Sequence, residues 1–220
     1  TYDAMDRVAS VEERTAATSE TTRYEYDVAG RLRRVISPDG SDVVHDYDVM
    51  GNRVSETSTA GVTHYAYDGD GRLVSAGSAA FGYDRAGNLI SRSESGRTTT
   101  YAYDAENRLI EVRTPDATVR HVYDAMGNRI RREVNGKTTR YVVDTLMPVP
   151  QVVAEQDAGG TNHYLVGASR LAKQLPSGKA VYFLEDRLGS TRCVVDDQGR
   201  LLTRYNYTAS SSPRVVEGTP

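Results

Sequence analysis

The hydrophobic and polar positions of this chain alternate over short segments that end at turn residues. The clearest example is residues 97–113, with the sequence RTTTYAYDAENRLIEVR. Thr99, Tyr101 and Tyr103 fall on one face of an extended strand, because successive side chains of a strand point to opposite faces. β-Branched and aromatic residues favour strands, whereas the Asp and Asn that follow favour a turn. The segment is therefore predicted to form a β-hairpin.

This pattern recurs as an internal repeat. A Tyr-Asp pair is followed, three residues after the aspartate, by Gly or a substitute, and the tyrosines are 16 to 24 residues apart. Two strands and two turns use about that many residues, which predicts one hairpin per repeat. A first copy begins at Tyr2, and the others are Tyr26, Asp27 and Gly30; Tyr47, Asp48 and Gly51; Tyr67, Asp68 and Gly71; Tyr83, Asp84 and Gly87; Tyr103, Asp104 and Asn107; and Tyr123, Asp124 and Gly127.

The residue types of the motif predict a specific turn. A short acidic side chain accepts hydrogen bonds from backbone N–H groups two or three residues further on. Gly and Asn tolerate positive φ, which a type I turn closed by a left-handed residue requires. Asp6 in the first copy departs from this rule.

The returning strand restarts an apolar face six residues after the tyrosine in most copies, as at Leu32 and Leu109. In the two Gly-Asn-Arg copies this position is Arg53 or Arg129, and the apolar residue comes one later, at Val54 or Ile130. A shift of one residue reverses the facing of a strand unless a bulge absorbs it.

Composition favours a thin structure. Apolar residues make up only 38% of the chain, with 15 Tyr, 2 Phe and no Trp. Tyrosine supplies a large ring for cross-strand packing while its hydroxyl stays hydrated or finds a partner. We therefore expect an all-β fold, an array of antiparallel β-hairpins in a single-layer sheet.

Charge and hydropathy exclude several partners. The net charge is −3 with acids and bases interspersed, so no basic stripe tracks a phosphate backbone and no nucleic-acid partner is expected. No run of about 18 apolar residues is present, so no membrane-spanning helix is expected. Because Thr1 is not an initiator Met and Tyr2 lacks its preceding strand, we expect a fragment of a larger shell.

The repeats YDVAGRL, YDVMGNRV, YDGDGRLV, YDRAGNLI and YDAMGNRI resemble the YD repeats of the Rhs family, which are shared with the C component of insecticidal toxin complexes and with teneurins. The later segment YFLEDRLGSTRCVVDDQGRLLTRYNY resembles the core block that follows the repeats in that family. The matching core residues are Asp186, Leu188, Gly189, Ser190, Arg192, Gly199 and Tyr205.

The resemblance implies a fold and an organisation. In that family the repeats wind into a spiralling β-sheet that closes as a hollow shell, and the core block precedes a variable domain, often a toxin. We therefore expect a YD-repeat hairpin array over residues 1–143, an Rhs core-like block continuing the sheet over 144–207, and a flexible C-terminal tail over 208–220. The tail, TASSSPRVVEGTP, lacks the self-cleavage motif of many bacterial members.

Few residues are candidates for chemistry. His45 and His121 sit two residues before a motif tyrosine, where other copies have tyrosine, so we expect strand positions and no metal site. Asp186, Asp196 and Asp197 include a possible acid pair for acid–base catalysis, but nothing in the sequence fixes their separation, so catalysis is not favoured. Cys193 has no identifiable activating partner. We expect no catalytic residues and no cofactor.

Two functions fit these features. The first is a structural shell segment that encapsulates or delivers an attached C-terminal polypeptide such as a toxin, with neighbouring YD repeats or other chains at the open sheet edges. The second is an extracellular module whose tyrosines bind carbohydrate or a cell surface. Either function implies a bacterial protein that is secreted or at the cell surface, and a secretion system could deliver it.

Overall fold

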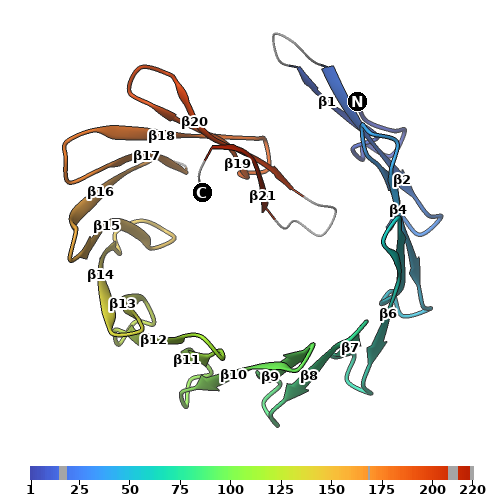
Figure 1. Cartoon of the computed structure of the whole chain (residues 1–220), viewed down its shortest axis with the longest axis horizontal. Helices are drawn as coiled ribbons and strands as arrows, with labels where there is room; N and C mark the ends of the chain where they lie inside the picture. Colours follow the sequence, from blue (N-terminus) through green and yellow to red (C-terminus); the bar gives the residue numbers. More distant parts are fainter. Residues whose placement is uncertain (15–18, 168, 208–212, 219–220) are drawn as a thin grey trace. The chain divides into compact units, whose positions relative to one another are not determined.

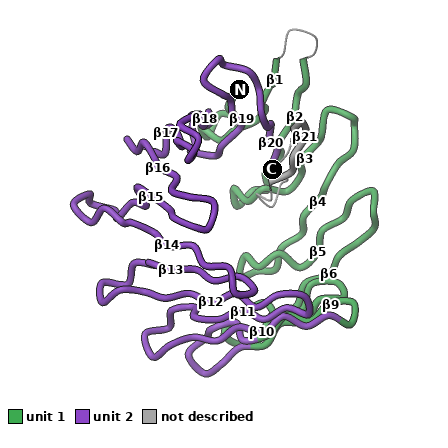
Figure 2. Tube along the Cα trace, turned by 60° about the vertical axis from the view of Figure 1, so that its left-hand side comes forward, with its two compact units in different colours: residues 1–82, 91–96 green, residues 83–90, 97–220 purple. Residues whose placement is uncertain are grey.

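The computed structural model describes residues 1–14, 19–167, 169–207 and 213–218. These residues form 21 strands and no helix. They divide into two compact units, Thr1–Gly82 with Ser91–Gly96 and Tyr83–Ile90 with Arg97–Pro220, which Figure 2 shows in different colours. Among the described residues, no helix has the length and hydropathy to cross a bilayer.

The strands are short and follow one another closely along the chain. The first unit holds β1 (Ser10–Arg14), β2 (Ser19–Tyr26), β3 (Leu32–Ile36), β4 (Asp42–Tyr47), β5 (Arg53–Ser58), β6 (Gly61–Tyr67), β7 (Leu73–Ala76) and most of β8 (Ala79–Tyr83). The residues of β9 (Leu89–Glu94) are divided between the two units. The second unit holds β10 (Arg97–Tyr103), β11 (Leu109–Arg113), β12 (Thr118–Tyr123), β13 (Arg129–Val134), β14 (Lys137–Asp144), β15 (Gln151–Asp157), β16 (Gly160–Val166), β17 (Arg170–Gln174), β18 (Ala180–Glu185), β19 (Thr191–Asp196), β20 (Leu201–Tyr207) and β21 (Pro213–Gly218).

Within each unit, consecutive strands pair antiparallel (Figure 1). These pairs run from β1–β2 to β7–β8 in the first unit and from β10–β11 to β20–β21 in the second. Among the described residues of each unit, strands contact only their sequence neighbours, so each unit is a single layer. The predicted all-β fold of antiparallel hairpins is confirmed.

The aspartate of each repeat begins a tight turn. At Asp27 the backbone N–H donates to the Arg31 carbonyl at 2.9 Å, and the Gly30 N–H donates back to the Asp27 carbonyl at 3.0 Å. The residue that closes the turn has positive φ, +82° at Gly30 and +58° at Asn107. Asp6 also has a φ of +58°, so the departure in the first copy leaves the turn unchanged. The same pair of backbone hydrogen bonds occurs at Asp3, Asp48, Asp68, Asp84, Asp104, Asp124, Asp186 and Asp196.

A β-bulge lies beside most of these turns and explains the two irregular copies. Tyr26 faces Leu32 across the hairpin, and Tyr47 faces Arg53 in the same way. The register shifts by one residue next to the tyrosine, which makes Val54 the extra residue of the bulge. Tyr123 likewise faces Arg129, and the shift skips Ile130. The bulge occurs in both kinds of copy. The displacement of the apolar residue by one position in the Gly-Asn-Arg copies therefore does not reverse the facing of the strand.

Little side-chain volume is fully buried. The buried apolar residues of the described chain are Val35, Ala79, Ala154 and Ala172, each 5 to 7% exposed. A single layer has solvent near both faces, so most side chains are only half-buried. Stability in such an array comes mainly from contacts between neighbouring repeats.

The described part of the C-terminal segment adds one more strand. Pro213–Gly218 form β21, which pairs antiparallel with β20, because the free edge of β20 offers backbone groups that need partners. Residues 208–212 and 219–220 lie outside the described residues. The expected domain boundary between residues 143 and 144 lies within β14, and β14 pairs directly with β15.

Candidate functional site

The motif residues form a ladder of contacts that links each hairpin to the next. We call this set of tyrosine, arginine and aspartate contacts the inter-repeat ladder. Its first component is the turn aspartate. Asp27 Oδ1 accepts hydrogen bonds from the N–H groups of Ala29 and Arg31, both at 2.9 Å, and its Oδ2 accepts one from Arg31 Nε at 2.7 Å. These bonds from the backbone and side chain of Arg31 lower the pKa of Asp27.

The second component is the tyrosine hydroxyl, which donates to a backbone carbonyl of the preceding repeat. Tyr47 Oη donates to the Leu32 carbonyl at 2.6 Å. The backbone pairing of β3 with β4 ends at Arg34 and Val44, so it does not extend to Leu32. The tyrosine hydroxyl therefore supplies a donor for the Leu32 carbonyl. The same bond joins Tyr26 to Val8, Tyr67 to Arg53, Tyr103 to Leu89, Tyr123 to Leu109 and Tyr207 to Thr191, at 2.8 to 3.0 Å.

The third component is an arginine that lies over the next tyrosine ring. The guanidinium carbon of Arg31 is 4.6 Å from the ring centroid of Tyr47, and Arg31 Nη1 donates to the Asp48 carbonyl at 3.1 Å. A guanidinium within about 6 Å of an aromatic centroid is attracted by the ring quadrupole. Equivalent stacks join Arg7 to Tyr26 at 4.3 Å and Arg108 to Tyr123 at 5.2 Å.

In the Gly-Asn-Arg copies, the cation over the tyrosine ring comes from the arginine that follows the asparagine. Asn52 Nδ2 donates to its own turn aspartate, Asp48 Oδ2, at 3.0 Å, so it makes no stack with the next repeat. Arg53, one residue later, lies 4.5 Å from the ring centroid of Tyr65. Arg129 similarly lies 5.3 Å from the centroid of Tyr141.

The segment expected to be the core block also places a cation over a tyrosine ring, here within the β16–β17 hairpin. The guanidinium carbon of Arg170 lies 4.2 Å from the Tyr164 centroid, and Lys173 Nζ is 2.8 Å from Glu155 Oε1. Burial, followed by the hydrogen bond with Glu155, raises the pKa of Tyr164. Glu155 and Lys173 thus form an ion pair beside the ring of Tyr164.

The carboxylates weighed as an acid pair are turn residues. Asp186 Oδ1 accepts from the N–H groups of Leu188 at 2.9 Å and Ser190 at 3.0 Å. Asp196 Oδ1 accepts from Gln198 and Arg200 N–H groups, both at 2.9 Å. The two turns lie at opposite ends of β19, so the carboxylates do not meet. Two copies of the turn were thus missed, with Glu185 or Val195 before the aspartate, although the Asp-x-x-Gly spacing could have revealed them.

The other core-block residues belong to the same structure. Gly189 and Gly199 close turns with φ of +79° and +76°. Arg192 lies 5.7 Å from the Tyr207 ring centroid and donates to Asn206 Oδ1 at 3.3 Å. Cys193 is half-buried on β19 opposite Leu184, and Tyr205 lies on β20 opposite Val215.

His45 lies on β4 opposite Glu56, and His121 lies on β12 opposite Arg132. His45 is 3% exposed, and its Nδ1 is 3.6 Å from Glu56 Oε2. Burial lowers the pKa of both histidines, and Arg53 near His45 and Arg129 near His121 act in the same direction. Within the part of the chain that the structure describes, no group of three His, Cys, Asp or Glu side chains is placed to hold a metal ion.

Comparisons with known proteins agree with this geometry. A family model described as Teneurin YD-shell matches residues 1–211. A search of curated proteins finds no match. The fold is similar to the crystal structure of TcdB2-TccC3, with a TM-score of 0.50 and 14% identity over 97% of this chain and 17% of that one.

Two further solved structures are similar to this chain. One is the crystal structure of TcdB2-TccC3-TEV, with a TM-score of 0.43 and 14% identity over 99% of this chain and 15% of that one. The other is the Photorhabdus luminescens Tc holotoxin pore, with a TM-score of 0.38 and 16% identity over 97% of this chain and 15% of that one. The chain spans less than a fifth of the length of these solved chains.

Proposed function

Because the chain belongs to the Teneurin YD-shell family, we propose that it forms part of a shell wall that encloses or delivers an attached polypeptide, such as a toxin domain. The family match confirms the resemblance seen in the sequence, and a structural shell role follows from it. The enclosure of an attached polypeptide by this wall is our proposal. The observation that supports it most is the inter-repeat ladder, in which motif tyrosines and arginines join one hairpin of the wall to the next. We propose no enzymatic activity.

The sheet edges support the proposed partners. Of the described strands, only β2 pairs with β1, and only β20 pairs with β21. An edge strand offers unpaired backbone groups that another strand can satisfy. We propose that neighbouring YD repeats or other chains pair at these edges. With this role we also propose a bacterial protein that is secreted or displayed at the cell surface through a secretion system.

The carbohydrate-binding alternative is not favoured by the ring environments. A sugar that stacks on tyrosine needs an open ring face. Tyr65 lies under Arg53 and Tyr47 lies under Arg31, so a guanidinium group already occupies one face of each ring. No observation favours glycans as partners.

Protease protection tests the proposed function. The complete gene product that contains residues 1–220 is prepared with an unstructured, epitope-tagged segment attached, and trypsin is added. The account expects the tag to survive in the native protein and to be digested after mild denaturation opens the wall. Digestion of the tag at the same rate in the native protein would rule out enclosure.

A further inference from the structure

The second unit exposes a row of apolar side chains on the face opposite the motif tyrosines. Val142, Leu165 and Leu184 each precede the residue at the tyrosine position of their hairpin, and they are 59%, 60% and 51% exposed. Across the hairpin they face Ala154, Ala172 and Cys193. We call Val142, Leu165 and Leu184 the apolar stripe. They lie on β14, β16 and β18, which follow one another in Figure 1.

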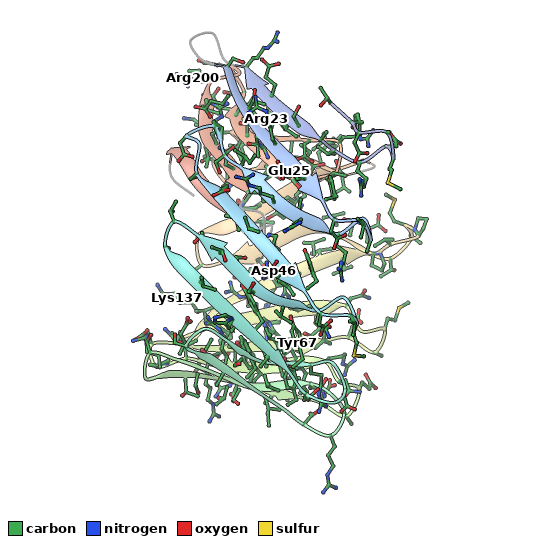
Figure 3. The ribbon with its side chains drawn as sticks, turned by 90° about the vertical axis from the view of Figure 1, so that its right-hand side faces the viewer. Arg23, Glu25, Asp46, Tyr67, Lys137 and Arg200 are labelled. Atoms are coloured by element: carbon green, nitrogen blue, oxygen red, sulfur yellow. The ribbon has the colours of Figure 1, made fainter. Side chains whose placement is uncertain are left out.

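Two equivalent positions of the first unit are polar and paired. Glu25 and Asp46, labelled in Figure 3, also precede motif tyrosines. Glu25 Oε1 is 3.8 Å from Arg34 Nη1, and Asp46 Oδ2 accepts a hydrogen bond from Ser55 at 2.8 Å. On β6, β10 and β12 the corresponding residues are Ala66, Ala102 and Val122. A large apolar side chain that is more than half exposed at this position is therefore a feature of β14, β16 and β18 among the described repeats.

Two arginines border the apolar stripe on the same face. Arg131 on β13 and Arg140 on β14 face each other directly in the register, and both are exposed. Neither makes an ion pair with any described residue, whereas nearby Arg120 is 3.0 Å from Glu111. Like charges directly opposite on neighbouring strands are destabilising, so a carboxylate placed between them stabilises the pair. Arg131 also borders a hollow of about 400 Å³ whose lining includes Ala102 and Val122.

We propose that this face of β13–β18 binds a polypeptide segment in which a carboxylate precedes apolar side chains. The carboxylate contacts Arg131 and Arg140, and the apolar side chains contact Val142 and then Leu165 and Leu184. Val142 lies two residues after Arg140, about 7 Å along the strand, which is the spacing between same-face side chains of an extended partner. The inference rests on the proposed function, since the segment bound is part of the polypeptide that the wall holds.

Peptide binding to residues 1–220 tests the proposal. The probe is a short fluorescein-labelled peptide of alternating Glu and Leu, and fluorescence anisotropy measures its affinity. The controls are peptides of alternating Lys and Leu and of alternating Glu and Ser. We expect the Glu and Leu peptide to bind at least about tenfold more tightly than either control, because the site needs both the charge and the apolar surface.

Variants assign the binding to this face. Arg131→Gln with Arg140→Gln should weaken binding about tenfold, because the charge-assisted hydrogen bonds to the carboxylate are lost. Leu165→Ser should weaken it by about fivefold through lost apolar contact. Lys137→Gln removes a charge from the same strand, β14, and should leave the affinity unchanged; its position is labelled in Figure 3. Thermal unfolding confirms that the variants fold like the parent.

Three outcomes would overturn the proposal. Equal affinities for the parent and the Arg131 and Arg140 variant would exclude this site. Equal binding of the Glu and Ser peptide would reduce it to a charge effect. A concentration-dependent dimer that Leu165→Ser abolishes would show that a second copy covers the stripe. Failure here with intact protease protection would leave the shell function standing, while loss of protection with retained peptide binding would overturn the shell function alone.

Discussion

In the repeat that turns at Asp27, the residue after the turn glycine is Arg31, whereas in the repeat that turns at Asp48 it is Asn52. The turns themselves are the same, because both aspartates accept hydrogen bonds from the N–H groups two and four residues further on. The links to the next hairpin differ. Arg31 reaches Tyr47, whereas Asn52 stays within its own turn.

The difference shows which parts of the motif can be exchanged. In the repeat that turns at Asp48, Arg53 supplies the cation one residue later and stacks on Tyr65. The hydroxyl bond to the preceding repeat is present in both cases, from Tyr47 and from Tyr67. The turn and the hydroxyl bond are therefore shared, and only the origin of the cation over the aromatic ring varies.

The largest effect is expected at the glycine that both kinds of turn share. Gly71 precedes Arg72 and Gly127 precedes Asn128, and their φ angles are +76° and +84°. A Cβ at either position meets no atom within 4 Å, so backbone conformation alone sets the cost. Val at either site should lower the free energy of unfolding by about 1 to 3 kcal/mol, measured by urea denaturation.

Gly127→Asn is the matched control for that prediction. Asn107 adopts the same left-handed conformation in another copy, with φ of +58°. The Asn variant should therefore lose much less stability than the Val variant. Equal losses for Val and Asn, or no loss for Val, would contradict the turn assignment.

The hydroxyl bonds should contribute equally in the two kinds of repeat. Tyr47→Phe and Tyr67→Phe each leave a backbone carbonyl without its donor, and each should cost about 1 kcal/mol of unfolding free energy. Tyr182→Phe is a suitable reference, because Tyr182 on β18 is exposed. Losses that differ widely between Tyr47 and Tyr67 would mean that the hydroxyl bond is not a common element.

The cation over the ring should distinguish the repeats. A double-mutant cycle between Arg31→Gln and Tyr47→Leu should give a coupling energy of about 0.5 to 1 kcal/mol. A cycle between Asn52→Gln and Tyr67→Leu should give a value near zero, since Asn52 bonds only within its turn. Similar coupling in both cycles would remove the distinction between Arg and Asn repeats.

The smallest effect is expected from the histidines that replace tyrosine. Burial lowers the folded pKa of His121, so the unfolded chain binds more protons and stability falls with acidification below the usual histidine pKa of about 6.5. The contribution is present above that pH and is lost as pH falls through the folded pKa. His121→Tyr should remove this part of the slope in a series of urea titrations. An unchanged slope would show that His121 is protonated equally in both states.

The sequence predicted the repeating parts of the fold well. Asp followed three residues later by Gly or Asn specifies the turn through local hydrogen bonding and backbone freedom, so the hairpins could be placed from sequence. The predicted family membership is confirmed as well. The turns at Asp186 and Asp196 were not predicted, because Glu185 and Val195 stand where the repeat motif has tyrosine.

The contacts between repeats could not be read in the same way. The acceptor of the Tyr47 hydroxyl is the Leu32 carbonyl, a backbone group that leaves no mark on residue identity. The bulge at Val54 depends on strand register, which is set across the hairpin and not within a strand. The apolar stripe could not be predicted either, because Val142 and Leu184 are ordinary strand residues in the sequence and only the structure gives their exposure.

The central claim is that each hairpin is a unit joined to its neighbours by the inter-repeat ladder. Deleting residues 104–123 removes one whole repeat and joins Tyr103 to the turn at Asp124, and deleting 114–123 alone removes one strand and breaks the alternation. Urea unfolding monitored by circular dichroism should show a cooperative β-sheet transition after the first deletion and a severely weakened one after the second. Loss of cooperative structure after the whole-repeat deletion, or equal tolerance of both deletions, would contradict the account.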